Sequence, residues 1–421
     1  MDLIYAEATP PGRGGVSIVR ISGTGARNAA ERLAGRLPQS RHAYLRQIAD
    51  GDEILDRALI LWFESGQSFT GEEVVEIHLH GAPVIVRRLG QLLRAQGIRL
   101  AEAGEFTRRA FLNGKMDLSE VEGLGDLLAA ETESQRRIAL RTSSGELARK
   151  AESWRSLLVR AGALTESSID FADEEVPDDV PEEVFVLLDR FRRELDDQIR
   201  GYAAAERIRN GFEVAIIGPP NAGKSSLLNR IGRREVALVS DVAGTTRDII
   251  ELRVDLRGLA VTFLDTAGLR ESQDRIESLG IDRARGRALA ADLRVHLSPE
   301  GNVDDQLWQP GDLAVTSKAD LQASGSELKV SSLTGEGLDE FLEKVFAALS
   351  QRAAGASLVS HERQLNALLA ARAAADVQED APPELIAEAL RQAAISLDSL
   401  LGRIGADDYL DVIFTSFCIG K

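Results

Sequence analysis

The chain of 421 residues is 44% hydrophobic and 28% charged, a composition typical of soluble globular proteins, and its length predicts two to three domains. Its net charge of −17 argues against a broad nucleic-acid-binding surface. Residues 1–120 carry 15 basic and 15 acidic groups, so the acidic excess lies in residues 121–421. We therefore expect any anionic partner to bind a local basic patch. The single cysteine, Cys418, excludes a disulfide framework, and no run approaches the ~20 apolar residues of a membrane span, so we expect a cytoplasmic protein.

Residues 1–118 mix short apolar runs with glycine-rich turns. The runs at 16–21, 58–63 and 74–79 are typical of strands, and residues 83–96 are typical of a helix. These patterns predict a small α+β domain.

Helical patterns lie before and after an α/β region in the second half of the chain. The segments 119–210 and 350–421 are helical in character, and an apolar stripe predicts one long helix through Val184, Leu188, Phe191, Leu195, Ile199 and Tyr202. Between them, residues 211–349 alternate strands and helices, which is typical of a doubly wound α/β sheet. We therefore predict an all-α domain in two parts, with the α/β domain inserted into it.

The inserted domain opens with a phosphate-binding loop. The apolar run 213–217 leads into G-x-x-x-x-G-K-S at 218–225, and a helical pattern follows. Backbone amides and the helix N-terminus would bind phosphates, with Lys224 reaching the β- and γ-phosphates and the Ser225 hydroxyl ligating Mg²⁺.

Two further elements follow in the order of a P-loop GTPase. Asp265 ends the strand-like run 261–264 and begins D-x-x-G, so its carboxylate can hold Mg²⁺ through water and the Gly268 amide can sense the γ-phosphate. Residues 244–248 carry a threonine pair that could complete the Mg²⁺ shell as a switch, and Thr246 is our candidate.

Base selection is predicted at Ser317-Lys318-Ala319-Asp320, after the strand-like run 313–316. The GTPase pattern is Asn-Lys-x-Asp, whose aspartate accepts two hydrogen bonds from guanine. Asp320 and Lys318 are present but Ser317 replaces the asparagine, so we expect guanine specificity with binding weakened by about 1–2 kcal/mol. Ser331-Ser332-Leu333 fits the last guanine-contacting loop, whereas 293–312 looks short and polar for the usual strand and helix.

The hydrolytic group is left open by the residues alone. Leu269 occupies the place of the glutamine that orients water in many small GTPases. Carboxylates that could do so instead are Glu271, Asp274 and Glu277. Arg247 and Arg270 could supply a cation, or they could be surface residues.

Over essentially its whole length the chain resembles the MnmE (TrmE) family of bacterial tRNA modification GTPases. The motifs that carry the resemblance lie at 9–16, 69–73, 104–107, 109–115, 218–225, 243–248 and 417–421, the last with a terminal C-x-G-K. It implies an N-terminal folate-binding domain, a split helical domain and an inserted G domain. It also implies a homodimer through the N-terminal domains and a heterotetramer-type complex with the FAD- and NADH-using MnmG (GidA).

The resemblance further implies the reaction and its groups. With MnmG the family forms a carboxymethylaminomethyl or aminomethyl group at C5 of the tRNA wobble uridine, using a one-carbon unit from a tetrahydrofolate. A 5-formyltetrahydrofolate site would comprise Arg20, Glu76, Lys115 and Lys421. Potassium-dependent pairing of G domains would use Asn221, Ser240, Val242 and Thr245 as K⁺ ligands, with Glu277 orienting water.

The predicted GTP-contacting residues combine the motifs and the resemblance. They are Gly218, Asn221, Ala222, Gly223, Lys224, Ser225, Ser226, Ser240, Asp241, Val242, Ala243, Gly244, Thr245, Thr246, Asp265, Thr266, Ala267, Gly268, Ser317, Lys318, Asp320, Ser331, Ser332 and Leu333.

The residues leave other functions open. The chain could be a GTP-driven assembly or signalling switch without a role in modification, or a folate enzyme with a vestigial G domain. The N-terminal 120 residues and the C-x-G-K tail argue against the first, and the intact Lys224, Thr246 and Asp265 argue against the second. Cys418 could take part in modification chemistry or be a small residue near the folate site. His78 and His80 favour packing or surface roles over a metal site.

Overall fold

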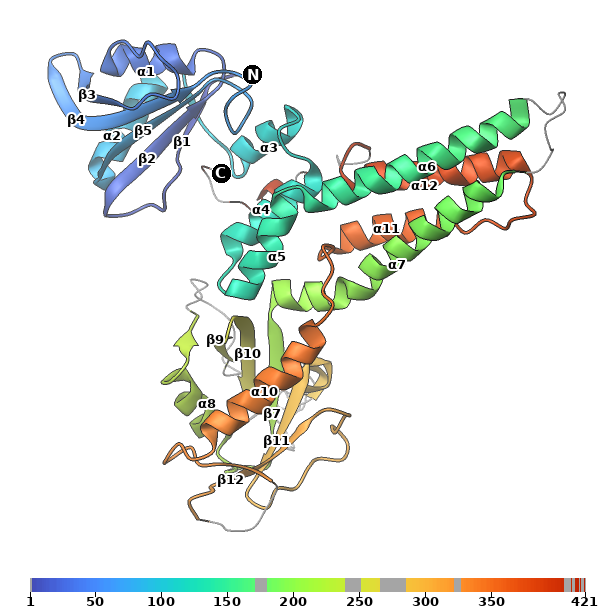
Figure 1. The fold of residues 1–421 in the computed structure, drawn as a ribbon. Helices are drawn as coiled ribbons and strands as arrows, with labels where there is room; N and C mark the ends of the chain where they lie inside the picture. The colour runs from blue at the N-terminus through green and yellow to red at the C-terminus, as the bar shows by residue number, and fades with distance from the viewer. Residues whose placement is uncertain are drawn as a thin grey trace, which may run out of the picture. The chain divides into compact units, whose positions relative to one another are not determined.

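The computed structural model describes residues 2–170, 180–238, 251–265, 285–321 and 327–404, together with 410, 413–415, 417 and 420. The chain divides into two compact units (Figure 1). The first comprises Met1–Gly125, Ser143–Ser156 and Arg391–Lys421, and the second comprises Asp126–Thr142 and Leu157–Leu390. Within the described residues, no helix is long and apolar enough to cross a membrane.

The first unit contains a six-stranded sheet in the order β3-β4-β5-β2-β1-β6. Its strands are β1 (Ile4–Glu7), β2 (Gly14–Ser22), β3 (Tyr44–Asp50), β4 (Glu53–Phe63), β5 (Val74–Gly81) and β6 (Arg99–Leu100). All neighbours are antiparallel except β1 and β6. The predicted strands at 16–21, 58–63 and 74–79 are confirmed as parts of β2, β4 and β5.

One face of this sheet is covered by helices α1 (Ala26–Ala34) and α2 (Pro83–Ala95), the second of which confirms the predicted helix at 83–96. Strand residues alternate, so Ile21, Ile60 and Ile77 lie in the core against both helices. The alternate residues face the other way and include Arg20 and Glu76. Burial of each large apolar side chain contributes about 1.5–3 kcal/mol, which fixes which side chains face outward.

Two further helical parts complete the first unit. Helix α3 (Glu105–Leu112) follows the sheet, and α4 (Leu118–Ala129) starts next. Leu118 and Val121 of α4 pack with Leu410, Phe414 and Phe417 near the C-terminus. The unit also includes the end of α5 (Glu133–Ser143), the start of α6 (Glu146–Asp170) and the end of α12 (Pro383–Leu400).

The long helix predicted from its apolar stripe is α7 (Glu182–Asn210), in the second unit. Val184, Leu188, Phe191 and Leu195 are buried, and Ile199 and Tyr202 are half-buried. Polar contacts from α7 reach the end of α11 (Glu362–Ala374), as the Arg192 guanidinium donates to the Ala375 carbonyl. The helical segments therefore flank the inserted domain on both sides in sequence, as predicted.

The inserted domain has a seven-stranded sheet in the order β13-β12-β11-β7-β10-β9-β8. Its strands are β7 (Phe212–Ile217), β8 (Val236–Ala237), β9 (Glu251–Leu256), β10 (Leu259–Asp265), β11 (Leu293–Ser298), β12 (Leu313–Ser317) and β13 (Leu328–Val330). Helices α8 (Lys224–Gly232) and α10 (Leu338–Ala353) pack on it. Strands β7, β10, β11, β12 and β13 are parallel, and β9 and β8 extend the sheet antiparallel, which confirms the α/β class.

The expectation that residues 293–312 are too short and polar for the usual strand and helix was wrong for the strand. Leu293–Ser298 forms the buried strand β11 beside β7, and it tolerates Arg294 because Asp312 lies against its guanidinium at 2.9 Å. Arg294 also donates to the Leu289 and Ala291 carbonyls. A buried cation with a carboxylate partner and satisfied donors is compatible with a central strand. Residues 299–312 connect β11 to β12 without a helix.

Candidate nucleotide-binding site

The phosphate loop joins β7 to α8 and has a backbone shaped for an anion. Asn221 and Gly223 have left-handed φ angles of 62° and 99°. A Cβ on Gly218 would come within 2.0 Å of the Leu297 carbonyl oxygen, so only glycine fits there. Parallel strands place this loop at the carboxyl edge of the sheet, ahead of the α8 N-terminus, which is where phosphates bind in such folds.

Lys224 is buried in the loop, with only 8% of its surface exposed. Its ammonium donates to the Gly218 carbonyl at 2.7 Å and to the Pro219 carbonyl at 3.1 Å. These bonds hold the charged end across the loop, where it can exchange carbonyl oxygens for phosphate oxygens.

A hydroxyl and a carboxylate meet beside the loop. The Ser225 hydroxyl donates a short hydrogen bond to the carboxylate of Asp265, which ends β10 and is 2% exposed. The neighbouring strands β7 and β10 bring these residues, 40 positions apart in sequence, together. Oxygen donors of this kind suit Mg²⁺, so both residues fit a magnesium ion that also contacts bound phosphates.

Four of the predicted base-binding residues, Lys318, Asp320, Ser332 and Leu333, line a cavity of about 520 Å³. Its lining is Ala222, Gly223, Ser226, Asn229, Arg230, Arg233, Lys318, Asp320, Leu321, Ser332 and Leu333. The Ser331 hydroxyl donates to Asp320 Oδ1 at 2.5 Å and accepts from the Thr334 amide at 3.1 Å, which orients the carboxylate. The cavity therefore joins the phosphate loop to the predicted guanine site. Sequence reasoning did not identify Asn229, Arg230 and Arg233, which reach it from α8.

Ser317 ends β12 with a buried hydroxyl. The residue is 3% exposed, and within the described part of the chain its Oγ has no hydrogen-bond partner. Lys318 follows with a left-handed φ of 57°, which turns the chain toward Asp320. The serine thus keeps the local backbone of the motif but leaves an unused polar atom beside it.

Several predicted residues lie outside the described residues. These are Ser240, Asp241, Val242, Ala243, Gly244, Thr245, Thr246, Thr266, Ala267, Gly268, Glu277, Cys418 and Lys421. The alternatives Glu271 and Asp274, and the arginines Arg247 and Arg270, lie there as well. Their roles stay predictions.

Arg20 and Glu76, predicted for folate, face each other on β2 and β5. Arg20 Nε and Nη2 donate to Glu76 Oε1 at 3.0 and 2.9 Å, and both side chains are about one-fifth exposed. The guanidinium also lies 5.9 Å from the Phe69 ring and 5.6 Å from the Phe106 ring. A charged pair beside two aromatic rings can accept both the polar edge and the face of a flat heterocycle.

Lys115 reaches the loop between β4 and β5 that also carries Phe69. Its ammonium donates to the Gly66 carbonyl at 2.6 Å, and a Cβ on Gly71 would come within 3.2 Å of its side chain. The loop therefore contacts both Lys115 and Arg20. The two histidines are not joined into a metal site: His80 bonds Asp56 at 2.7 Å, and His78 Nε2 lies 3.6 Å from Glu76.

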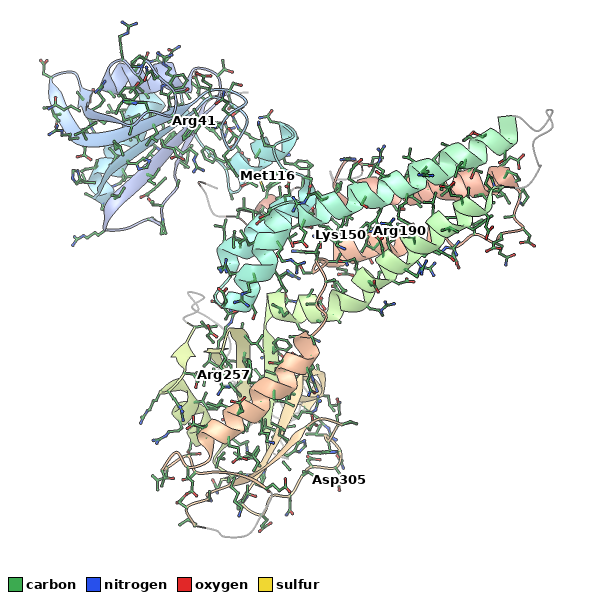
Figure 2. All side chains as sticks on the ribbon, viewed as in Figure 1. Arg41, Met116, Lys150, Arg190, Arg257 and Asp305 are labelled. Carbon is green, nitrogen blue, oxygen red and sulfur yellow. The ribbon has the colours of Figure 1, made fainter. Side chains whose placement is uncertain are left out.

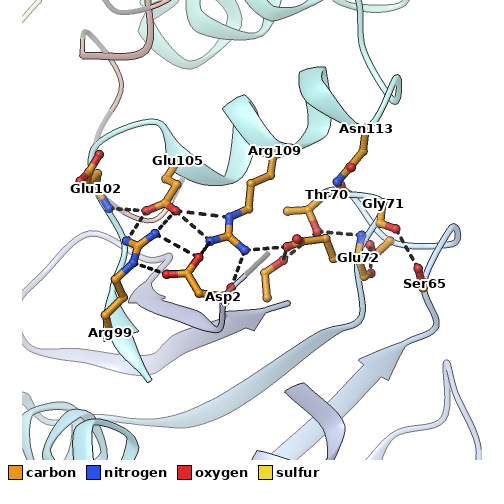
Figure 3. A network of polar contacts seen from close by, with 12 residues as sticks. Asp2, Ser65, Thr70, Gly71, Glu72, Arg99, Glu102, Glu105, Arg109 and Asn113 are labelled. Atoms are coloured by element: carbon orange, nitrogen blue, oxygen red, sulfur yellow. Dashed lines mark hydrogen bonds and ion pairs between the residues drawn. The ribbon is translucent and has the colours of Figure 1, made fainter. Parts of the chain in front are cut away.

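A polar network under this loop was not recognised in the sequence (Figure 3). The Arg109 guanidinium, 4% exposed, bonds Glu72 and Glu105 at 2.9 Å each, and Asp2 Oδ1 at 2.8 Å. Burial raises the pKa of Glu105, but hydrogen bonds from Arg99, the Glu102 amide and Arg109 together outweigh it and leave that pKa below its usual value. Because Glu72 belongs to the loop, the network fixes the loop that carries Phe69.

The comparisons with known proteins agree with this geometry. A model of the GTP-binding protein TrmE N-terminus matches residues 3–115, and a model of the MnmE helical domain matches residues 118–418. The chain is 61% identical over 421 residues to tRNA modification GTPase MnmE of Paracoccus denitrificans, and each chain is covered completely. The chain belongs to the MnmE family.

Other MnmE relatives match just as completely. Those of Dinoroseobacter shibae and Cereibacter sphaeroides are 52% and 50% identical over 429 residues, with all of both chains covered. Membership confirms the resemblance read from the motifs, and with it the architecture of MnmE: an N-terminal domain, a helical domain and a G domain.

Proposed function

We propose that the chain hydrolyses GTP and acts as a tRNA modification GTPase. The observation that carries the proposal is one cavity lined both by Ala222 and Gly223 of the phosphate loop and by Asp320 of the base-selection motif. The same loop continues into Lys224, held at the Gly218 carbonyl, and into Ser225, which bonds Asp265. Phosphate, magnesium and base would then each meet a separate group. The names of the full-length MnmE relatives support the tRNA substrate.

The phosphate end would work by position and charge. Lys224 and the α8 N-terminus would hold the β- and γ-phosphates, and Ser225, Asp265 and Thr246 would hold Mg²⁺, which neutralises charge on the transferred phosphoryl group. The Asn221 side chain, on a backbone with positive φ, would be the loop's ligand for K⁺ with Ser240, Val242 and Thr245. The family resemblance assigns the orientation of the attacking water to Glu277, because Leu269 replaces the usual glutamine.

A variant pair tests this reading of the site. Lys224→Ala should lower GTP turnover at least a hundredfold because a positioned cation on the phosphates is lost. Asn221→Ala should retain turnover in NaCl but lose the acceleration that KCl gives the unaltered chain. Equal rates in KCl and NaCl for the unaltered chain would remove the potassium role, and full turnover by Lys224→Ala would remove the whole assignment.

In the N-terminal domain we propose a site for 5-formyltetrahydrofolate or a related reduced folate. Glu76 and Arg20 would pair with the polar edge of the pterin, whereas Lys115 and Lys421 would meet the glutamate carboxylates. Cys418 would lie near the transferred one-carbon unit. Arg20→Met and Lys115→Met should each weaken folate binding at least tenfold by calorimetry, and GTP turnover should stay unchanged.

The proposed partners are a second copy, MnmG and tRNA. The sheet face opposite α1 and α2 exposes Leu45 and Leu59, which supports a homodimer through the N-terminal domain. With MnmG, an FAD- and NADH-dependent protein, the dimer would form a heterotetramer-type complex that modifies C5 of the wobble uridine. If the chain hydrolyses GTP but does not contribute to tRNA modification in its host, it would instead be an assembly or signalling switch.

A further inference from the structure

The helix-covered face of the N-terminal sheet carries an excess of arginine. The side chains on α1 and α2, that of Arg36 just after α1 and those on the same side of β3 include seven arginines and two carboxylates. The arginines, here called the basic face, are Arg27, Arg32, Arg36, Arg46, Arg87, Arg88 and Arg94. Because residues 1–120 sum to zero charge, this domain is polarised.

The two carboxylates on this side are already engaged. Glu31 accepts hydrogen bonds from the Leu37 amide at 2.7 Å and from Arg27 at 3.1 Å. Asp50 pairs with Arg88. Among the described residues, no carboxylate is within ion-pair distance of Arg32, Arg36, Arg46, Arg87 or Arg94. Most of the positive charge is therefore uncompensated, although Asp52 and Glu53 bound the face at the turn after β3.

Strand β3 joins the two helices of the face. Arg46 donates to the carbonyl of Arg36, two residues beyond α1, and Asp50, four residues further along β3, pairs with Arg88 of α2. Four residues of strand span about 13 Å, and Arg87 and Arg94 are about 10 Å apart along α2. The arginines thus form one band across the helix layer rather than separate charges.

The band has almost no apolar component. Val84, 63% exposed, is the large hydrophobic side chain that α2 presents to solvent, whereas Leu45 and Leu59 lie on the opposite face of the sheet. A protein partner would need a buried apolar or aromatic centre, but a phosphate backbone needs only distributed cations. Charge complementarity therefore favours a polyanion over an acidic protein surface.

We propose that the basic face binds the sugar–phosphate backbone of the tRNA substrate. The proposal rests on the proposed function and adds to it the surface that holds the RNA. The arginines would position the RNA without reading its sequence, since contacts to phosphate carry no base information. Nothing in this role requires GTP, because the face and the phosphate loop belong to different compact units.

The test compares two full-length variants that lose the same charge. Arg32→Gln, Arg87→Gln and Arg94→Gln together remove three exposed arginines of the basic face. The control replaces Arg190, Arg193 and Arg200, which are exposed on α7 among acidic residues, with glutamine (Figure 2 labels Arg190). Binding of an unmodified tRNA transcript is measured by fluorescence anisotropy over a series of KCl concentrations.

The basic-face variant should bind tRNA about tenfold to a hundredfold more weakly at 0.1 M salt. The plot of log affinity against log salt has a negative slope, and the magnitude of that slope should decrease by about two to three in this variant. The control should match the unaltered chain, and both variants should keep its melting temperature and GTP turnover. Unchanged affinity and slope in the basic-face variant would overturn the assignment, as would an equal loss in the control. If the unaltered chain itself fails to bind tRNA, the proposed function fails with it.

Discussion

At the scale of single residues, we propose that Ser317 limits how tightly guanine is held. An asparagine there could donate and accept hydrogen bonds, whereas the serine hydroxyl is buried without a partner in the described residues. We expect Ser317→Asn to strengthen GTP binding about fivefold to thirtyfold, equivalent to the 1–2 kcal/mol of regained hydrogen bonds. Isothermal titration with GTP and ATP measures this.

Ser317→Ala is the matched control for that experiment. Removing an unsatisfied buried hydroxyl should leave GTP affinity within about twofold and should not lower stability. If the alanine variant loses GTP binding, the serine already contacts the base, and our account of this position is wrong.

Arg109 and its carboxylates tie Asp2, α3 and the β4–β5 loop together. Arg109→Met leaves Glu72 buried without its cation and removes one of the two arginines that pair with Glu105, so it should destabilise the N-terminal domain by about 3–5 kcal/mol, measured by chemical denaturation. Folate binding should weaken in parallel, because the network holds the loop that carries Phe69.

The same network predicts acid sensitivity. The pKa of Glu105 is lowered in the folded state, so its stabilisation is present above the ordinary glutamate pKa of about 4.3 and is lost as pH falls through the folded value. Melting temperatures between pH 7 and pH 3 should fall less steeply for Glu105→Gln than for the unaltered chain. Glu102→Gln, on an exposed neighbour, should follow the unaltered chain, and identical slopes for all three would contradict the argument.

At the scale of secondary-structure elements, β11 depends on a pair that lies far apart in sequence. Asp312, 18 residues after Arg294, is fully buried against it. Asp312→Asn should destabilise the G domain by about 3–5 kcal/mol, whereas the double change Arg294→Met and Asp312→Leu should recover most of that loss. Trp308, whose ring centre lies 5.1 Å from that of His296, gives a local fluorescence signal for unfolding. A double variant no more stable than Asp312→Asn would contradict this view of the pair.

Sequence patterns predicted the features that depend on residues close together in the chain, and they missed those that depend on distant partners. The α7 stripe and the phosphate loop depend on residues close in sequence, so periodicity and spacing predicted both. Residues 293–312 look short and polar for the usual strand, and 298–302 are poor strand material. Strand β11 forms within them because the distant Asp312 makes the burial of Arg294 and His296 acceptable. Arg109 was overlooked for the same reason, since its partner Asp2 lies 107 residues away.

Motif spacing also predicted which residues belong to the nucleotide site, but it did not predict which of them contact one another. Ser225 and Asp265 were both assigned to Mg²⁺, but their contact depends on β7 lying beside β10. The cavity is also lined by Asn229 and Arg230 of α8 and by Arg233 at its end. The helical repeat of α8 places them there, and they belong to no motif. Strand order is a property of the whole sheet, so sequence patterns alone could not supply these neighbours.

At the scale of the whole molecule, the proposed sites are distributed over two compact units. Arg20, Glu76 and the basic face belong to the first unit, and Lys224 and Asp320 belong to the second. We infer that GTP turnover serves as a timing step, while folate and tRNA meet the chain elsewhere. Loss of either function should therefore abolish modification without abolishing the other binding activity.

The proposed function of this GTPase is modification of the tRNA wobble uridine. The most direct measurement is mass spectrometry of wobble nucleosides from a deletion strain complemented with the unaltered chain, with Lys224→Ala or with Arg20→Met. We predict that the deletion lacks the carboxymethylaminomethyl and aminomethyl groups, that the unaltered chain restores them, and that neither variant does. Normal wobble uridines in the deletion strain would contradict the claim.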